Sequence, residues 1–320
     1  MIFNRQLNLN CGNKVAIIGT GFVGSTTAYS LMLDGIASEI VLIDKDKKLA
    51  QGHALDLMHG MQFTNSTNII AGDSFELVAD AKIVIVTAGA AQKSDQSRSE
   101  LLNTNVNIFK NIIPEIVKHN KDCILLIVTN PLDVMTYVAY KLSGFEKCKV
   151  FGTGTVLDTS RLRYLMGQEF KISPKDINAY ILGEHGDSQF VWWSHANIAG
   201  MPISNFTQDE KDLLNKLYKK VKDLVYEVID KKGATYFAIA TVITKIIRAI
   251  LTNQARVLTV SSVVSDENGK ELCISVPTVL RSGGICQVLN IDLDKQEQLL
   301  WDKSCSKIKA EIAQALDIIY

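Results

Sequence analysis

VAIIGTGFVG, the stretch from Val15 to Gly24, decides how the first half of this chain folds. Its four apolar residues predict a short buried strand, and three glycines follow with the spacing G-x-G-x-x-G where a helical pattern begins. Gly19 allows a tight turn, Gly21 lets the backbone approach a pyrophosphate, and Gly24 lets the helix pack closely on the strand. The first amides of that helix would bind phosphate. The stretch therefore predicts a dinucleotide-binding turn.

An acidic residue at the end of the next expected strand indicates which dinucleotide binds. Asp44 lies twenty residues after Gly24 and closes an apolar run. A carboxylate there accepts hydrogen bonds from the adenosine ribose and would repel a 2′-phosphate, so we expect NAD rather than NADP. A glycine-rich turn followed by a chance acid is the alternative, but the strand, the helix and Asp44 in register favour the cofactor site.

Short apolar runs alternate with longer helical patterns in the first half of the chain. Near-continuous apolar runs predict strands covered on both faces, at Lys14 to Ile18, Glu39 to Asp44, Lys82 to Thr87 and Cys123 to Thr129. Crossover helices are expected between them, at Gly21 to Leu33, Lys48 to His59 and Ser97 to Asn120. The alternation predicts an α/β fold with a Rossmann-type, doubly wound parallel sheet.

The pattern changes in the second half of the chain. A last strand of the first kind is expected at Val150 to Thr153. Strands with hairpin turn signals follow at Ile177 to Leu182, Val257 to Val264, Cys273 to Val279 and Ile285 to Leu289. Helices are expected at Asp158 to Phe170, Asp209 to Lys231, Tyr236 to Leu251 and Lys295 to Ile319. We therefore expect a Rossmann cofactor domain at residues 1–153 and a mixed α+β substrate domain at residues 154–320.

The composition argues against several classes of partner. Thirty-four basic residues balance thirty-four acidic ones, so no net field would hold nucleic acid or an anionic membrane. The six cysteines form no C-x-x-C pair and no zinc-type cluster with histidine, so we expect mostly buried thiols in a reducing compartment, and no metal. We see no signal peptide near the N-terminus, and Tyr236 to Leu251 is too short to cross a bilayer. We expect a cytoplasmic protein with a small-molecule substrate.

Two polar clusters in the second half suggest chemistry. His185 follows an apolar strand within Gly-Glu-His-Gly-Asp, and Asp158 and Arg161 lie three residues apart on one expected helix, so they share a face. Taken alone, each has an ordinary structural explanation, a satisfied histidine or a surface ion pair. The residues become informative only together.

Six segments together resemble the L-lactate and malate dehydrogenase family, over nearly the whole chain. They are Ile18-Gly19-Thr20-Gly21-Phe22-Val23-Gly24, Thr87-Ala88-Gly89, Thr129-Asn130-Pro131-Leu132-Asp133, Gly152 to Asp158, Gly183-Glu184-His185-Gly186-Asp187 and Lys232 to Tyr236. The resemblance implies interconversion of lactate and pyruvate by hydride transfer to and from NAD. It implies these cofactor-binding residues: Gly19, Gly21, Phe22, Val23, Gly24, Asp44, Thr87, Ala88, Gly89 and Asn130.

The resemblance also assigns catalytic roles that the chemistry needs. Oxidation of a 2-hydroxy acid requires a base near neutral pKa at the hydroxyl, and His185 matches that residue. Asp158 would hold the other ring nitrogen and stabilise the imidazolium. Arg161 matches the residue whose planar fork binds the substrate carboxylate, and Arg98 matches one that polarises the ketone.

Three further residues are expected around the substrate. Gln92 matches the residue that contacts the far end of the substrate, and its neutral side chain suits the methyl group of lactate better than the second carboxylate of malate. It lies in a lid segment that has Ser94-Asp95 where relatives have Pro-Gly or a similar pair. Asn130 is expected beside the nicotinamide, although a pre-proline turn also explains it. Thr235 is either a pocket wall or a helix-start hydroxyl, and the sequence does not separate the two.

Regulation and assembly are expected only through the resemblance. Relatives activated by fructose 1,6-bisphosphate pair an arginine with a histidine at a subunit interface. Arg163 matches the first, but Asn178 replaces the second, so we doubt this activation. A homotetramer is expected, with a dimer as alternative, and we assign His53, His59, His119 and His195 to surfaces or subunit contacts. A malate or other 2-hydroxyacid dehydrogenase and a non-catalytic NAD-binding protein stay open as alternatives.

Overall fold

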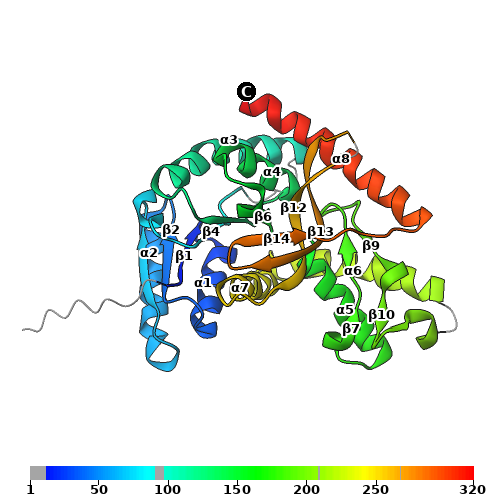
Figure 1. The fold of residues 1–320 in the computed structure, drawn as a ribbon. Coiled ribbons are helices and arrows are strands. Elements are labelled where there is room, and N and C mark those ends of the chain that lie inside the picture. Colours follow the sequence, from blue (N-terminus) through cyan, green and yellow to red (C-terminus); the bar gives the residue numbers. More distant parts are fainter. Residues whose placement is uncertain (1–11, 91–96, 208–209, 267) are drawn as a thin grey trace, which may run out of the picture.

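One long twisted sheet is the central element of the fold (Figure 1). The computed structural model describes residues 12–90, 97–207, 210–266 and 268–320. Strands of the first half run in parallel in the order β3-β2-β1-β4-β5-β6. They are β1 (Lys14–Ile18), β2 (Glu39–Ile43), β3 (Asn68–Gly72), β4 (Ile83–Val86), β5 (Ile124–Ile127) and β6 (Val150–Gly152). The order reverses between β1 and β4, which is the switch point where doubly wound sheets bind ligands. The expected Rossmann sheet is confirmed.

Three strands of the second half extend the same sheet. They are β12 (Arg256–Ser265), β13 (Glu271–Arg281) and β14 (Gly284–Val288), and they pair antiparallel to one another. β12 joins the parallel strands by pairing with β6, through Ser261 and Gly152. The expected hairpin strands therefore exist, and they share a sheet with the first half of the chain.

Helices cover both faces of this sheet, and alternate strand residues divide the core accordingly. Val15 and Ile17 of β1 pack with α1 (Phe22–Asp34), α2 (Lys47–Gly60) and α7 (Phe237–Leu251). Ala16 and Ile18 point to the opposite face, which is covered by α3 (Arg98–His119), α4 (Leu132–Ser143) and α8 (Lys295–Ile319). A two-residue period with both faces buried is the arrangement that a near-continuous apolar strand predicts.

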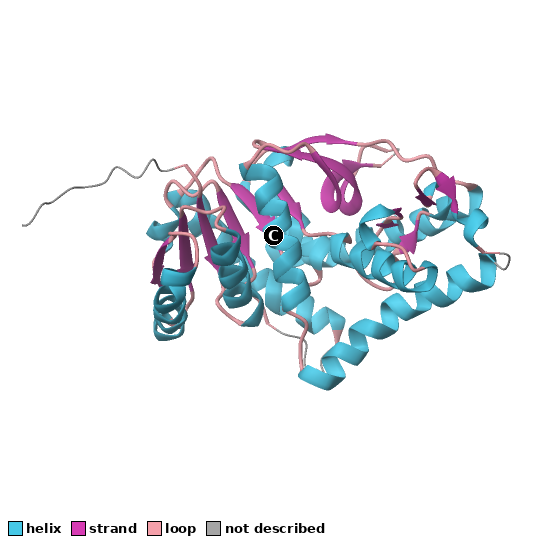
Figure 2. Cartoon of the chain, turned by 90° about the horizontal axis from the view of Figure 1, so that it is seen from below, coloured by secondary structure: helices cyan, strands magenta, loops and turns pink. Residues whose placement is uncertain are grey.

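A second lobe holds a smaller core of its own. It contains α5 (Val156–Phe170) and α6 (Glu210–Lys232), with short strands β7 (Ile177–Asn178), β8 (Ile181–Leu182), β9 (Phe190–Val191), β10 (Asn197–Ile198) and β11 (Met201–Pro202). Figure 2 shows these short strands among the helices of the lobe, apart from the main sheet. The single strand expected from Ile177 to Leu182 is wrong, because β7 pairs with β10 and β8 pairs with β9.

Two elements of the first half do not appear in the sequence prediction. α4 is buried along nearly its whole length and follows directly on the expected strand at Cys123 to Thr129, and its residues were not recognised as a helix. β3 is a short strand at the edge of the sheet, with an exposed asparagine at its start. A strand of five residues with this mixed burial offers little periodicity for a prediction from sequence.

The cysteines are less buried than expected. Cys123 and Cys273 are buried, whereas Cys148 and Cys305 are half-buried and Cys286 is exposed. Cys11 lies outside the described residues. Among the described helices, none alone is long and apolar enough to cross a membrane, and only α6 with α7 reaches that length and hydropathy, as a pair bent by 119°.

Candidate active site

The glycine turn lies at the switch point, where the ends of β1 and β4 meet. Thr87 follows β4, and its hydroxyl donates to the carbonyl oxygens of Gly19 at 2.8 Å and Ile18 at 3.2 Å. The backbone N–H of Ala88 also donates to Ile18, at 2.9 Å. The segment Thr87-Ala88-Gly89 is thereby fixed beside the turn. The two segments implicated in cofactor binding, far apart in sequence, lie side by side at the carboxyl ends of β1 and β4.

The three glycines of the turn have different surroundings. Gly19 has a φ of +94°, which favours glycine. A Cβ at Gly24 would overlap the carbonyl oxygen of Gly19, so the helix can approach the strand only without a side chain. A Cβ at Gly21 would meet no atom of the described chain within 4 Å. The first and third glycines thus serve the fold, and the second leaves open space at the start of α1.

Asp44 lies directly beyond β2 and faces the glycine turn. Its Oδ2 accepts hydrogen bonds from the backbone N–H of Thr20 at 2.6 Å and from the Thr20 hydroxyl at 3.0 Å, and its Oδ1 accepts from the Asp46 N–H at 3.0 Å. Partial burial acts to raise the pKa of Asp44, but these hydrogen bonds outweigh it and keep the pKa below its usual value. The carboxylate is therefore charged at neutral pH.

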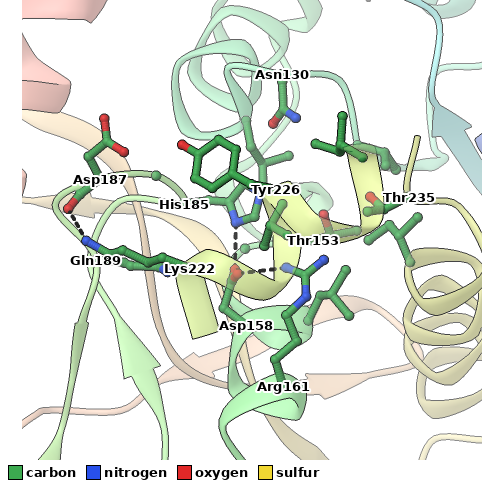
Figure 3. A pocket seen from close by; sticks show the side chains of 18 of the residues that line it. Asn130, Thr153, Asp158, Arg161, His185, Asp187, Gln189, Lys222, Tyr226 and Thr235 are labelled. Carbon is green, nitrogen blue, oxygen red and sulfur yellow. Dashed lines mark hydrogen bonds and ion pairs between the residues drawn. The ribbon is translucent and has the colours of Figure 1, made fainter. Parts of the chain in front are cut away.

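A pocket with a volume of about 320 Å³ opens between the sheet and the second lobe (Figure 3). Val23 of α1 and Val128 after β5 line one part of it with apolar surface, while Asn130 and Thr153 add polar groups at the strand ends. The second lobe contributes Asp158, Arg161, His185, Gly186, Asp187, Gln189, Lys222, Val225, Tyr226 and Ile229. The structure thus brings six of the predicted site residues to one cavity: Val23, Asn130, Asp158, Arg161, His185 and Thr235.

His185, Asp158 and Arg161 form a connected cluster in this pocket (Figure 3). The Nδ1 of His185 lies 2.7 Å from Oδ2 of Asp158, and the other carboxylate oxygen accepts from a terminal nitrogen of Arg161 at 3.0 Å. The Asp158 side chain is only 4% exposed, whereas the imidazole is 28% exposed. Because Nδ1 is engaged by the carboxylate, Nε2 is the ring nitrogen that remains for a substrate. The ion pair is buried, unlike an ordinary surface pair.

The charges of the cluster stabilise one another. Burial acts to lower the pKa of His185, but the Asp158 carboxylate outweighs it, with a smaller contribution from Asp133, and the pKa is raised. Burial acts to raise the pKa of Asp158, yet His185 and Arg161 lower it further than burial raises it. The arrangement favours an imidazolium beside a carboxylate, as required of a group that releases a proton to a substrate near neutral pH.

Asp133 has a role that was not predicted from the sequence. It lies in the first turn of α4 with a side chain that is buried, and its Oδ2 accepts the backbone N–H of His185 at 2.7 Å. Its Oδ1 accepts the hydroxyl of Ser261 at 2.6 Å. Burial raises the pKa of Asp133 to about 6, against the lowering effect of these hydrogen bonds. The sequence signal is an acid in the first turn of a mostly buried helix, but its contact with His185 depends on how α4 packs.

The wall formed by α6 was also missed. Lys222, Val225, Tyr226 and Ile229 of this helix line the pocket, and the Lys222 ammonium donates to the carbonyl oxygen of Asp187 at 2.9 Å. The helix itself was expected, but its sequence does not indicate which neighbour its faces meet. That information depends on how α6 packs on α5, a contact between distant segments.

The remaining expected residues fall into two groups. Asn130 and Thr235 line the pocket, and the ring of Phe22 stacks on Tyr236 with centroids 5.2 Å apart, which brings the start of α7 to the glycine turn. Gln92 and Ser94-Asp95 lie outside the described residues. Arg98 is the first residue of α3, but its side chain is outside the described part of the structure.

Within the described part of the structure, no group of three or more His, Cys, Asp or Glu residues could hold a metal ion.

Arg163 and Asn178 both interact with their own chain. The Nε of Arg163 donates to the carbonyl oxygen of Ala179 at 2.9 Å, and its guanidinium carbon lies 4.6 Å from the ring centroid of Tyr180. The amide of Asn178 donates to Oδ1 of Asn197 at 3.2 Å. The two side chains are thus held by neighbours within the second lobe.

Similarity to solved structures covers nearly the whole chain. A lactate dehydrogenase from a Medee basin deep-sea metagenome library superposes with a TM-score of 0.90 and is 37% identical, over 95% of this chain and 99% of that one. The minor L-lactate dehydrogenase from Enterococcus mundtii superposes with a TM-score of 0.91 at 38% identity, over 95% and 98% of the two chains. Fold and sequence are therefore similar over the same extent.

Sequence comparison covers the same extent. An L-lactate dehydrogenase of Acetivibrio thermocellus is 49% identical over 311 residues, 95% of this chain and 98% of the relative. One from Clostridium botulinum is 46% identical over 308 residues, 94% and 96% of the two chains. Residues 13–152 match the family model of the lactate/malate dehydrogenase NAD binding domain, and residues 155–319 match that of the alpha/beta C-terminal domain. The chain belongs to the lactate/malate dehydrogenase family.

Proposed function

We propose that this protein is an NAD-dependent L-lactate dehydrogenase, in which His185 exchanges a proton with the substrate. The observation that carries the proposal is the buried cluster in which Asp158 contacts His185 at 2.7 Å and Arg161 at 3.0 Å within one pocket. An acid–base group and a carboxylate-binding group side by side suit a 2-hydroxy or 2-keto acid. The names of the similar proteins support the same choice.

The residues present fit NAD. The open space at Gly21 leaves room for a pyrophosphate at the N-terminus of α1, and the charged Asp44 lies where the adenosine ribose hydroxyls would be bound. Val23, Val128 and Ile239 give the pocket an apolar wall suited to a nicotinamide ring, with Asn130 beside it. Phe22, Thr87, Ala88 and Gly89 complete the proposed cofactor-binding set. When bound, NADH supplies the hydride.

The proposed chemistry of the protein is a proton transfer from His185. The imidazolium donates its Nε2 proton to the keto oxygen of pyruvate as the carbonyl carbon is reduced, and it takes the proton back in the reverse direction. Asp158 holds Nδ1, fixes the ring orientation and stabilises the positive charge between turnovers. Because the pKa of His185 is raised, the protonated form needed for pyruvate reduction is available near neutral pH.

Substrate orientation is assigned to two arginines and a glutamine. Arg161 is held against Asp158 by one terminal nitrogen, and the planar guanidinium would bind the substrate carboxylate with the others. Arg98 would stabilise the negative charge that develops on the keto oxygen, and Gln92 would contact the methyl end. Thr235 would form part of the pocket wall.

The decisive experiment is a keto acid comparison with NADH, followed at 340 nm. We expect kcat/KM for pyruvate to exceed that for oxaloacetate and for branched 2-keto acids. A preference for oxaloacetate would favour the malate dehydrogenase alternative, and no turnover with any keto acid would favour a non-catalytic NAD-binding protein. In reverse, (S)-lactate but not (R)-lactate should reduce NAD, and NADPH should be a poor substitute for NADH because of Asp44.

Domain limits, assembly and regulation are part of the proposal. We assign residues 1–153 to a Rossmann NAD-binding domain and residues 154–320 to an α+β substrate-binding and catalytic domain. The described cysteines are free thiols, which supports the proposed cytoplasmic location. A homotetramer is proposed, and the exposed apolar side chains of α2, Leu49, Leu55 and Met58, support a subunit contact there. Light scattering after gel filtration measures the assembly. Activation by fructose 1,6-bisphosphate is not expected.

A further inference from the structure

The main chain on which His185 sits is held from several sides. The backbone N–H and carbonyl of Gly183 pair with the backbone of Ser275 in β13, at 3.1 and 3.0 Å. The N–H of Glu184 then donates to the hydroxyl of Ser304 in α8 at 2.7 Å, and the N–H of His185 donates to Asp133 of α4 at 2.7 Å. Two consecutive amides are therefore taken by side chains from two different helices.

Asp133 is the charged member of this arrangement. Its side chain is buried, and its two oxygens connect α4 to β12 through Ser261 and to the His185 segment. The first turn of a helix favours a carboxylate, because the unpaired N–H groups there carry partial positive charge. A buried carboxylate bridging three elements is costly unless all its contacts persist. Its hydrogen bond to the candidate catalytic histidine gives it a contact that packing alone does not require.

We propose that Asp133 is a positioning residue for His185, holding the main chain from which the imidazole reaches Asp158 and placing a second negative charge behind the ring. The inference rests on the proposed function of His185 as the proton donor. Asp158 orients the ring at Nδ1, and Asp133 fixes the backbone from which the ring projects. Both contacts are needed to define where Nε2 lies in the pocket. Displacement of a reacting group by about 1 Å can cost on the order of 100-fold in rate.

The charge of Asp133 acts on His185 together with other groups. Asp158 of α5 contacts both the ring and Arg161, Glu184 is paired with Lys307 of α8, and Lys222 of α6 is hydrogen-bonded to the Asp187 carbonyl. Among these groups, Asp158 acts most strongly to raise the pKa of His185, Asp133 adds to that effect, and Arg161 opposes it. Since the pKa of Asp133 is about 6, the carboxylate is charged at neutral pH.

Three variants separate the hydrogen bond from the charge. Asp133→Asn keeps an oxygen that accepts the His185 N–H but removes the charge, and Asp133→Ala removes both. Ser304→Ala is the matched control, because it releases the neighbouring amide of Glu184 without changing any charge. Each full-length variant is first checked for NADH affinity by fluorescence titration, which should stay within about twofold of wild type, since the cofactor turn is untouched.

The first readout is pyruvate reduction as a function of pH. Reduction requires protonated His185, so kcat/KM falls as pH rises through the pKa of that residue. Asp133→Asn should move the midpoint of this fall to lower pH by roughly half a unit or more, while retaining activity below the midpoint within about tenfold. Asp133→Ala should lose on the order of 10- to 100-fold even at low pH. Ser304→Ala should lower activity without moving the midpoint.

The second readout needs no turnover. Imidazole reacts with diethyl pyrocarbonate only in its neutral form, so the pH at which the peptide carrying His185 becomes modified, followed by mass spectrometry, measures the pKa of His185. Asp133→Asn should lower this midpoint, and Ser304→Ala should leave it unchanged. If the wild type does not reduce pyruvate, the proposed function fails, but the shift in reactivity still tests the contact between Asp133 and His185.

The outcomes are distinct. A lowered midpoint in Asp133→Asn, with a larger loss of activity in Asp133→Ala, supports the positioning role. An unchanged midpoint in Asp133→Asn overturns it, as does equal activity of the Asn and Ala variants. If Asp133→Ala does not fold, the midpoint of Asp133→Asn, measured against Ser304→Ala, decides alone.

Discussion

The glycine turn and the His185 cluster are built in opposite ways. The turn comes from one contiguous stretch, Val15 to Gly24, in which each glycine has a separate steric reason. The cluster combines Asp133 from α4, Asp158 and Arg161 from α5, and His185 from the loop after β8. A local motif contains its own geometry, whereas an assembled site depends on the packing of distant elements. Substitutions should therefore affect the two regions differently.

The largest expected effect separates chemistry from cofactor binding. His185→Asn should leave NADH affinity nearly unchanged and reduce turnover on pyruvate by roughly 10²–10⁴-fold, the range expected from loss of a general acid–base group. The reason is that, under the proposed function, His185 acts on the substrate, while the turn at Gly19 to Gly24 would bind the cofactor. Fluorescence titration and steady-state kinetics measure the two quantities separately.

His195→Asn is the control for this variant. His195 lies ten residues further along the chain, stacked on Trp192 at 4.2 Å and next to Ser194. Its replacement should change turnover far less. Near wild-type turnover in His185→Asn, or an equal loss in both variants, would show that His185 is not the proton donor.

Much of the first region could be predicted from residues alone. β1, β2 and the helix α1 between them follow from apolar runs and glycine spacing, because a strand covered on both faces has to be apolar throughout. The position of Asp44 beside the turn was likewise predictable, since one βαβ unit sets its distance from the turn along the chain. In these cases short-range sequence determines the local geometry.

The second region needed the family resemblance, and even so it was incomplete. His185, Asp158 and Arg161 each have ordinary explanations until the fold brings them within 3.0 Å of a partner. The contact of Asp133 with the backbone of His185 could not be predicted without knowing that α4 packs there. Predicting the pocket wall formed by α6 would have required the same kind of long-range contact. Antiparallel strands were predicted, but not that they continue the parallel sheet, because strand partners are long-range pairings.

The next expected effect concerns substrate choice, which rests on resemblance alone. Gln92→Arg should move preference from pyruvate toward oxaloacetate, because arginine would pair with the second carboxylate, whereas pyruvate would leave that charge without a partner. A gain of roughly 1–3 kcal/mol in discrimination, about 10- to 200-fold in the ratio of kcat/KM values, is the scale of one such contact. Both keto acids are measured in wild type and variant at fixed NADH. An unchanged ratio would remove Gln92 as the specificity residue.

Two glycine variants test the contiguous region at a smaller scale. Gly24→Ala forces a methyl group against the Gly19 carbonyl, so it should destabilise the protein by about 1–3 kcal/mol, visible as a lower melting temperature. In Gly21→Ala the added methyl group meets no described atom within 4 Å, so the variant should have the melting temperature of wild type. It should bind NADH on the order of tenfold more weakly, because the methyl group would occupy the space proposed for the pyrophosphate. Equal melting temperatures and equal affinities in both variants would contradict the division of roles.

The smallest expected effect is the absence of a response to fructose 1,6-bisphosphate. Asn178 is neutral and bonded to Asn197, and Arg163 is stacked on Tyr180 and bonded to Ala179, so a bisphosphate would meet one cation already engaged by its own chain. At pH 7 the activator should change the KM for pyruvate by less than about twofold, because phosphate binding normally requires charge-assisted contacts. Asn178→His restores a group that can be protonated, and we expect it to increase the response, more strongly at pH 6 than at pH 8, because only imidazolium attracts a phosphate. A large fall in KM in the wild type would instead mean that other residues complete the site, and that assembly from distant segments has again supplied what the local sequence lacks.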